Sequence, residues 1–301
     1  MALSSPLPQF VKVYEVGARD GLQNEVNNLN PEIRIELIEK LVGAGIRSIE
    51  AGSFVSPKWI PQMAGTDEVF ANLRRDDRAT YAALVPNERG MLAAIDSRAD
   101  EVAVFAAASE SFSQRNINCS ISESLARFEP VMALAQTHQI PVRGYVSCVI
   151  GCPYEGAIEP KSVRAVSDAL FDMGCYEVSL GDTIGVGTPL SFQHMLEAVM
   201  EHHDPQVAVH CHDTYGQALA NIYASLQMGV SVVDSSVAGL GGCPYAKGSS
   251  GNVATEDLLY MLEGLGIETG IELDKIIEVG QFISDLLGRE SQSKVARAKT
   301  V

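Results

Sequence analysis

The sequence of 301 residues is long enough for one large domain or two smaller ones, and 46% of it is apolar, which is ample for an extensive core. Its formal net charge of −16 sets up a field that repels nucleic acid and anionic membrane surfaces, so neither is an expected partner. The first residues lack the pattern of a secretory or mitochondrial leader, and no window approaches the roughly 18 apolar residues of a membrane span. We therefore expect a soluble cytoplasmic protein whose six scattered cysteines are reduced.

Short β-rich runs alternate with amphipathic helical runs along the whole chain. The expected strands cover residues 11–16, 48–51, 80–85, 101–107, 142–149, 176–180, 207–212 and 232–237. The expected helices between them include residues 31–44, 121–138, 160–173, 189–201 and 217–228, and two more helices follow at 255–264 and 273–287. Prolines early in helices, such as Pro31 and Pro189, and glycines near helix ends, such as Gly174, support these limits.

This alternation predicts a single α/β domain over residues 1–301, a (β/α)8 TIM barrel with extra helices at its carboxyl end. A doubly wound open sheet is the main alternative, but no Gly-x-Gly-x-x-Gly follows an early strand. In such barrels the chemistry lies at the carboxyl ends of the strands. Polar or glycine-rich residues stand at these ends, namely Arg19-Asp20, Glu50 with Ser53, Ser147, Ser179 with Asp182, His210 with His212, and Gly239 to Gly242.

His210 and His212 follow an apolar run that is typical of a buried strand, so their side chains should face the same side. Two imidazoles so placed can share one divalent cation, although two histidines at a strand end can also be merely hydrogen-bonded. Asp20 and Asn252 would add carboxylate and amide oxygens, a donor set that suits Mg²⁺ or Mn²⁺ and does not exclude zinc. The structural alternatives are a turn residue for Asp20 and a helix cap for Asn252.

Arg19 either stabilises a developing enolate or a carboxylate, or forms a structural ion pair with Glu50 or Glu15. The segment 237–248 is rich in glycine and contains Cys243. Such a segment approaches a ligand closely, closes as a flap or cradles phosphate, although the Gly-x-x-x-x-Gly-Lys-Ser/Thr pattern of a phosphate loop is absent. Its thiol either exchanges a proton or is incidental.

Taken in order, the Arg19-Asp20-Gly21 motif, Glu50 with the following Ser-Phe-Val-Ser-Pro-Lys, the His210-x-His212 pair and the loop 239–252 resemble the 3-hydroxy-3-methylglutaryl-CoA (HMG-CoA) lyases. The resemblance runs over nearly the whole chain. The Arg-Asp-Gly and His-x-His motifs are shared with a wider superfamily of metal-dependent acyl-CoA lyases and condensing synthases, whereas Gly-Leu-Gly-Gly-Cys-Pro-Tyr-Ala resembles the signature segment of the lyases. The short tail after the last helices argues against the synthases with an added regulatory domain.

The resemblance implies a retro-Claisen cleavage of HMG-CoA to acetyl-CoA and acetoacetate, as in leucine and ketone-body metabolism. It implies Mg²⁺ or Mn²⁺ held by Asp20, His210, His212 and Asn252. Either Asp20 or His210 would be the general base, Arg19 would stabilise the enolate, and Cys243 would protonate the carbanion. The remaining implied site residues are Glu50, Asp182 and Glu256, which would orient Arg19 and the loop, and Ser53 and Ser179, which would contact substrate.

The partner implied is a small CoA thioester, and the family suggests a homodimer. In the late helical tail only Arg289 or Lys294 could help to hold CoA. Three other functions stay open at this point. The first is a lyase for a longer branched 3-hydroxyglutaryl-CoA, the second is a metal-dependent 2-oxo acid aldolase or condensing enzyme, and the third is a barrel that binds metal or CoA without catalysis.

Overall fold

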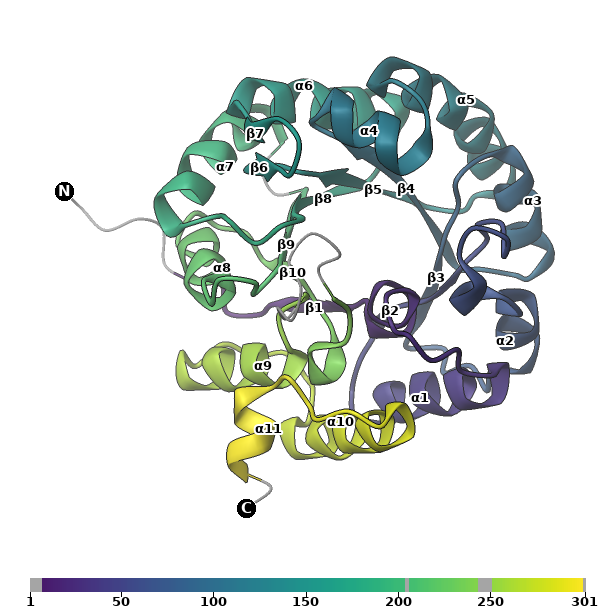
Figure 1. Cartoon of the computed structure of the whole chain (residues 1–301), viewed down its shortest axis with the longest axis vertical. Helices are drawn as coiled ribbons and strands as arrows, with labels where there is room; N and C mark the ends of the chain where they lie inside the picture. Colours follow the sequence, from purple (N-terminus) through teal and green to yellow (C-terminus); the bar gives the residue numbers. More distant parts are fainter. Residues whose placement is uncertain (1–6, 204–205, 243–250, 300–301) are drawn as a thin grey trace.

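The structure, a computed structural model, describes residues 7–203, 206–242 and 251–299. Eight parallel strands close into a barrel with helices around it (Figure 1). The barrel strands are β1 (Lys12–Glu15), β2 (Ser48–Ser53), β3 (Thr80–Leu84), β4 (Glu101–Ala107), β5 (Val142–Ser147), β8 (Glu177–Asp182), β9 (Val207–Cys211) and β10 (Val232–Ser235). Around the barrel they follow the order β1-β10-β9-β8-β5-β4-β3-β2, which confirms the predicted (β/α)8 TIM barrel.

A helix follows each barrel strand and covers its outer face (Figure 1). These helices are α1 (Pro31–Gly43), α2 (Thr66–Asn72), α3 (Glu88–Asp96), α4 (Glu110–Ile117), α5 (Ile121–His138), α6 (Pro160–Met173), α7 (Pro189–His203), α8 (Ala218–Leu226) and α9 (Thr255–Gly264). At the carboxyl end α10 (Leu273–Leu287) follows as expected, and a further helix, α11 (Lys294–Lys299), comes after it. Within the described residues, no helix combines the length and the apolar character needed to cross a membrane.

Local signals in the sequence explain several helix limits. The Asn30 side chain accepts a hydrogen bond from the Ile33 N–H just before Pro31, so α1 begins with both a cap and an N-terminal proline. A reciprocal capping box between Ser120 and Glu123 starts α5. Gly174 ends α6 in the left-handed conformation, with φ of 107°.

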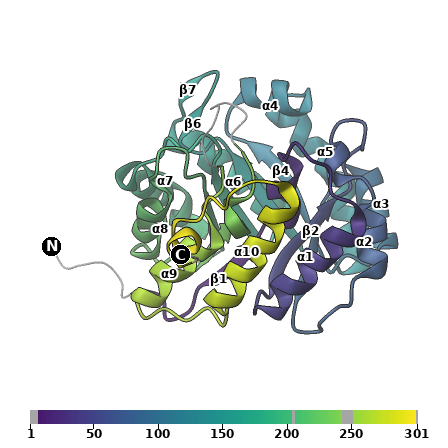
Figure 2. The same ribbon diagram turned by 60° about the horizontal axis from the view of Figure 1, so that its bottom comes forward.

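The sequence analysis did not predict four short helices, α2, α3, α4 and α11, because six to nine residues carry little periodic signal. It also extended five strands by one or two residues at their carboxyl ends, namely those expected over 11–16, 80–85, 142–149, 207–212 and 232–237. The strand expected over 142–149 ends at Ser147, and Cys148 follows with φ of 61°. A small hairpin of β6 (Gly151–Cys152) and β7 (Gly156–Ala157) comes next, and in Figure 2 this hairpin and α4 project from the same end of the barrel.

The strand expected over 11–16 ends at Glu15, because residues Gly17–Gly21 coil into a π-helical turn, η1. This turn places Arg19 and Asp20 at the carboxyl end of β1, which is the end at which the site was expected. π-helical turns are rare and occur often at functional sites. The local chain geometry therefore singles out the same two residues as the motif does.

The barrel strands separate an apolar layer, between the strands and the helices, from a largely polar region inside the barrel. Their outward side chains, such as Val13, Val104 and Val209, join one large apolar cluster with the helices. The inward side chains two residues apart are largely polar, and they are named below where they meet the site. Such buried polar groups need partners, so the barrel interior is held by hydrogen bonds and ion pairs as well as by packing.

Candidate metal centre and active site

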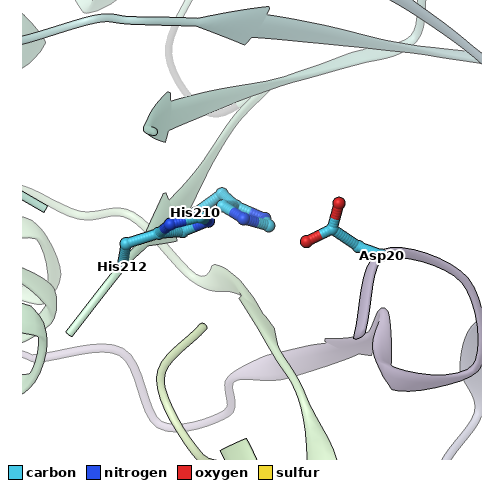
Figure 3. A group of neighbouring side chains, drawn as sticks. All are labelled: Asp20, His210 and His212. Carbon is cyan, nitrogen blue, oxygen red and sulfur yellow. The ribbon is translucent and has the colours of Figure 1, made fainter. Parts of the chain in front are cut away.

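His210, His212 and Asp20 converge at the carboxyl end of the barrel. Each offers a ligand atom, and these atoms all lie within 4.8 Å of one another. Figure 3 shows both imidazoles extending from β9 toward the Asp20 carboxylate, which comes from the turn after β1. Strand alternation explains the pairing, because the intervening Cys211 points the other way, into the outer apolar cluster. The predicted set of two imidazoles and a carboxylate is thus brought together in space.

The electrostatics of these three groups suit a cation. Burial and the neighbouring His210 together lower the pKa of His212 to about 4, although Asp20 opposes the shift, so this imidazole is neutral at physiological pH. Burial opposes ionisation of Asp20, but Arg19 and the two imidazoles hold the pKa of its carboxyl below the ordinary value. The buried Nδ1 of His212 has no hydrogen-bond partner among the described residues. The neutral His212 imidazole, with its unsatisfied buried nitrogen, and the ionised Asp20 carboxylate fit a divalent metal ion. Burial opposes the charged form of His210, but its contacts with Asp234 and Asp20 raise its pKa.

Asn252 joins this group through the chain segment after the glycine-rich loop. Its Nδ2 donates to Oδ2 of Asp20 at 2.9 Å and to the carbonyl of Leu240 at 3.1 Å. The segment runs beside the end of β9, where the Val253 N–H donates to the Cys211 carbonyl at 3.1 Å. Ala254, not Asn252, occupies the N-cap of α9, so the capping alternative for Asn252 is wrong.

Arg19 is held from two sides. One Nη lies 2.6 Å from Oε2 of Glu50 and the other lies 2.7 Å from Oδ1 of Asp20. The guanidinium also lies over the ring of Tyr145, 5.6 Å from its centroid. The alternative ion pair with Glu15 is wrong, because Glu15 accepts instead from the N–H groups of Gly17 and Val237 and from the Thr255 hydroxyl. The ion pair with Glu50 is present, and it is compatible both with the structural alternative for Arg19 and with an orienting role of Glu50.

Asp182 and Glu256 both bind loop backbone. Asp182 accepts hydrogen bonds from the N–H groups of Val186 and Gly187, at 3.2 and 2.7 Å. Burial raises its pKa to about 6, although these N–H groups oppose the shift. Glu256 accepts from Ala238 N–H at 3.0 Å, within the turn η3 (Val237–Gly239), and burial raises its pKa to about 8. These contacts support a loop-orienting part for both carboxyl groups.

The two predicted substrate serines are buried and hydrogen-bonded within the protein. Ser53 donates to the Leu84 carbonyl at 3.3 Å and accepts from the Val55 N–H at 3.3 Å. Ser179 donates to Oδ2 of Asp234 at 2.7 Å. Sequence reasoning missed Asp234, although one carboxylate in the apolar run of β10 was a usable signal, since charge in a strand is costly without a partner.

The glycine-rich segment is described at its two flanks only, and Cys243 lies outside the described residues. At the first flank Gly241 has φ of 102°, and a Cβ there would lie 2.9 Å from Nδ2 of Asn252. Glycine is thus required at this position both for its backbone conformation and for the close approach of the amide.

Both basic candidates for CoA contact already have acidic partners. Arg289 forms an ion pair with Glu25 and also donates to the Gly239 carbonyl at 3.4 Å. Lys294 lies 2.9 Å from Oδ2 of Asp213 and has a side chain that is 64% exposed. These contacts tie the carboxyl-terminal segment to the loops around the site. A CoA phosphate would have to share either cation with a carboxylate.

Comparison with known proteins agrees with this geometry. The sequence profile of the HMGL-like family matches residues 10–283. A curated relative in Macaca fascicularis, the mitochondrial hydroxymethylglutaryl-CoA lyase, is 59% identical over 97% of this chain and 90% of its own. A relative in Pseudomonas aeruginosa, named 3-hydroxy-3-isohexenylglutaryl-CoA/hydroxymethylglutaryl-CoA lyase, is 58% identical over 97% of this chain and 98% of its own. The solved HMG-CoA lyase of Acinetobacter baumannii, in complex with coenzyme A and 3-methylmalate, is 35% identical with a TM-score of 0.93, over 98% of this chain and 96% of that one.

Proposed function

Since this chain belongs to the HMGL-like family, among the hydroxymethylglutaryl-CoA lyases, we propose that it cleaves HMG-CoA to acetyl-CoA and acetoacetate. The observation that carries this proposal is the meeting of Asp20 with His210 and His212, with Arg19 directly beside them. A retro-Claisen cleavage needs a base for the hydroxyl proton and a cation for the developing enolate. Both kinds of group stand at this one site.

The residues of the chain divide the reaction into proton transfer and charge stabilisation. Asp20 or His210 takes the proton of the tertiary hydroxyl, and the C2–C3 bond breaks as C3 becomes the ketone carbon of acetoacetate. The electron pair passes to the thioester enolate, whose oxygen Arg19 stabilises. One such contact is worth about 3 kcal/mol of barrier. The Cys243 thiol then gives its proton to C2, which completes acetyl-CoA.

Asp20, His210, His212 and Asn252 would hold Mg²⁺ or Mn²⁺. When bound, such an ion supplies Lewis acidity to the substrate hydroxyl and carboxylate. Asn252 also keeps Asp20 in place through its 2.9 Å hydrogen bond, and Glu50 keeps Arg19 beside it. Ser53 and Ser179 would act on substrate only if their internal hydrogen bonds are exchanged, so we assign them to the walls of the site.

A second candidate substrate is a 3-hydroxyglutaryl-CoA with a longer branch at C3. The name of the Pseudomonas aeruginosa relative includes such a substrate together with HMG-CoA. In this chain an apolar cluster of Leu84, Ala103 and Tyr145, with Val55 and Phe105 packed against it, lies on the side of the barrel where Tyr145 meets Arg19 and His210. This cluster would face a branch that points away from the metal ligands.

We place the reaction in the cytoplasm, as one step of leucine or ketone-body metabolism, and expect one catalytic domain per chain and a homodimer. The solved Acinetobacter baumannii complex with coenzyme A supports a CoA thioester as the small-molecule partner. No nucleic acid or membrane partner is expected, because the net charge of −16 opposes both.

The test is to incubate the purified protein with HMG-CoA and a divalent cation and to measure acetoacetate and acetyl-CoA separately. We expect both products in equal amounts. A parallel reaction with the isohexenyl-branched thioester compares kcat/KM for the two branches. If neither HMG-CoA nor its isohexenyl-branched analogue is cleaved, but added acetyl-CoA condenses with a 2-oxo acid, the protein is a condensing enzyme instead. Binding of the thioester without turnover would identify a non-catalytic protein.

A further inference from the structure

A string of alternating charges runs through the barrel interior toward His210. Lys12 Nζ lies 2.7 Å from Oε2 of Glu177, and the other oxygen of Glu177 accepts from Nε of Arg143 at 2.7 Å. Arg143 in turn donates to Oδ1 of Asp234 at 2.7 Å, and Oδ2 of Asp234 lies 3.2 Å from Nδ1 of His210. Arg143 and Asp234 are fully buried, so each charge depends on the next for its compensation.

The contacts of Asp234 fix which imidazole nitrogen of His210 carries the proton. Its Oδ2 accepts from the Ser179 hydroxyl at 2.7 Å and from Nη1 of Arg143 at 3.2 Å. With arginine on both oxygens, Asp234 is ionised and can only accept hydrogen bonds. In the neutral imidazole of His210, Nδ1 must therefore carry the proton, and the lone pair is left on Nε2, the nitrogen that can bind a cation.

We propose that Asp234, locked by Arg143, is a positioning residue that holds His210 in the tautomer and ring orientation needed for metal binding. Carboxylates that accept from the second nitrogen of a metal-bound histidine act in this way in other metal sites. His212 differs, because its Nδ1 has no hydrogen-bond partner among the residues the structure describes. The inference rests on the metal centre of the proposed function and adds a residue that does not itself touch metal or substrate.

A role in metal binding also accounts for an ion pair that stability alone explains poorly. Taking two charges out of water costs free energy that their attraction often fails to recover, and apolar replacements can be neutral or stabilising. The direct contact of Asp234 with His210 gives this buried pair a role in orienting the imidazole. The prediction that follows is specific to Asp234 and does not extend to other buried polar groups of the barrel.

The first variant is Asp234→Asn, which preserves size and shape. Arg143 would keep the amide oxygen, so the amide NH₂ would point at Nδ1 of His210. That arrangement favours the tautomer with the proton on Nε2. A protonated Nε2 has no lone pair with which to bind a metal ion. We expect the dissociation constant for Mn²⁺, measured by the electron paramagnetic resonance signal of free Mn²⁺, to rise about 10- to 100-fold.

The second variant separates tautomer control from simple loss of packing. In Arg143→Met/Asp234→Asn no guanidinium holds the amide oxygen, so the amide can turn and accept from Nδ1 of His210. The double variant should therefore bind Mn²⁺ more tightly than Asp234→Asn alone. The matched control is Tyr14→Phe, which removes a buried hydrogen bond to Glu101 next to the same ion pair and keeps the ring against which Arg143 lies. We expect it to leave the Mn²⁺ affinity unchanged.

The tautomer can also be read in the wild-type protein, so the proposal does not depend on the folding of a variant. A ¹⁵N-histidine NMR spectrum of the metal-free protein, assigned with His210→Gln, should show the His210 proton on Nδ1. A proton on Nε2, or wild-type Mn²⁺ affinity in a folded Asp234→Asn protein, would overturn the inference and leave the proposed function standing. A wild-type protein that does not bind Mn²⁺ would overturn both.

Discussion

Glu50 contacts Arg19 through a single oxygen, Oε2, which accepts a hydrogen bond from Nε at 2.6 Å and also lies 2.6 Å from Nη2 of the guanidinium. Its other oxygen has no hydrogen-bond partner among the described residues. Burial raises the pKa of Glu50 even though Arg19 opposes the shift. The orientation of the guanidinium toward the site thus depends on one carboxylate oxygen from β2 and on the Asp20 contact from its own turn.

Glu50→Gln is expected to lower kcat about 10- to 100-fold, because a hydrogen bond to a charged group contributes roughly 1.5–3 kcal/mol. Metal affinity should change little, since the metal ligands are untouched. Steady-state kinetics and Mn²⁺ binding measured on the same preparation separate the two effects. Arg19→Met serves as the reference for complete loss of the cation. Full turnover in Glu50→Gln would show that Arg19 needs no such support.

Gly241 and Gly229 form a matched pair for testing the approach of Asn252. Both have a left-handed backbone, with φ of 102° and 98°, but only at Gly241 would a Cβ meet Asn252, at 2.9 Å from Nδ2. Each alanine substitution should lower the melting temperature through backbone strain of about 1–3 kcal/mol. Only Gly241→Ala should also weaken Mn²⁺ binding. Equal Mn²⁺ affinity in the two variants would show that Asn252 has room to move.

The ionisation of Glu256 should make the free energy of unfolding depend on pH. Burial raises its pKa to about 8 in the folded protein, against 4.5 as its ordinary value. Between these values the folded state keeps a proton that the unfolded state has lost, so the free energy of unfolding falls as the pH rises. The nearby Glu15, with a pKa raised to about 7 by burial, contributes with the same sign.

Glu256→Gln cannot ionise, so it should flatten this decline and be more stable than the wild type at pH 9. The difference between the two proteins should grow by a few kcal/mol, at about 1.4 kcal/mol per pKa unit, from pH 5 to pH 9. Urea unfolding at both pH values measures it. Parallel curves for the two proteins would mean that Glu256 has an ordinary pKa.

Cys243→Ala should cut turnover severely and leave Mn²⁺ affinity unchanged, because the thiol is assigned to proton transfer and not to metal binding. The control is Cys175→Ala, which removes a thiol buried in the outer core. Its turnover should stay close to that of the wild type. Unchanged turnover in Cys243→Ala would remove Cys243 from the mechanism.

Much of this molecule could be predicted from its sequence because local patterns decide it. Strand and helix periodicity repeats through the chain, and strand alternation alone places His210 and His212 on one side. Asp20 follows another strand, and its position near His210 and His212 can be predicted because the carboxyl ends of all strands lie at the same end of a closed parallel barrel.

What could not be predicted depends on register across the barrel. Asp234 forms an ion pair with Arg143, 91 residues away in sequence, and the residues next to either one in the chain do not predict this partner. The π-helical turn at Arg19 and the departure from the strand at Cys148 are likewise backbone features that side-chain patterns do not encode. The sequence indicated where the site lies, and the structure identifies the residues that hold it in place.

Metal reconstitution of HMG-CoA cleavage tests most directly whether Asp20, His210 and His212 form a catalytic metal centre. Protein stripped with a chelator should form no acetoacetate, and stepwise addition of Mn²⁺ or Mg²⁺ should restore cleavage until one ion is bound per chain. Asp20→Asn, treated identically, should regain almost nothing. Acetoacetate formation by chelator-treated protein at the rate of the reconstituted enzyme, or full activity in Asp20→Asn, would contradict the centre formed by Asp20, His210 and His212.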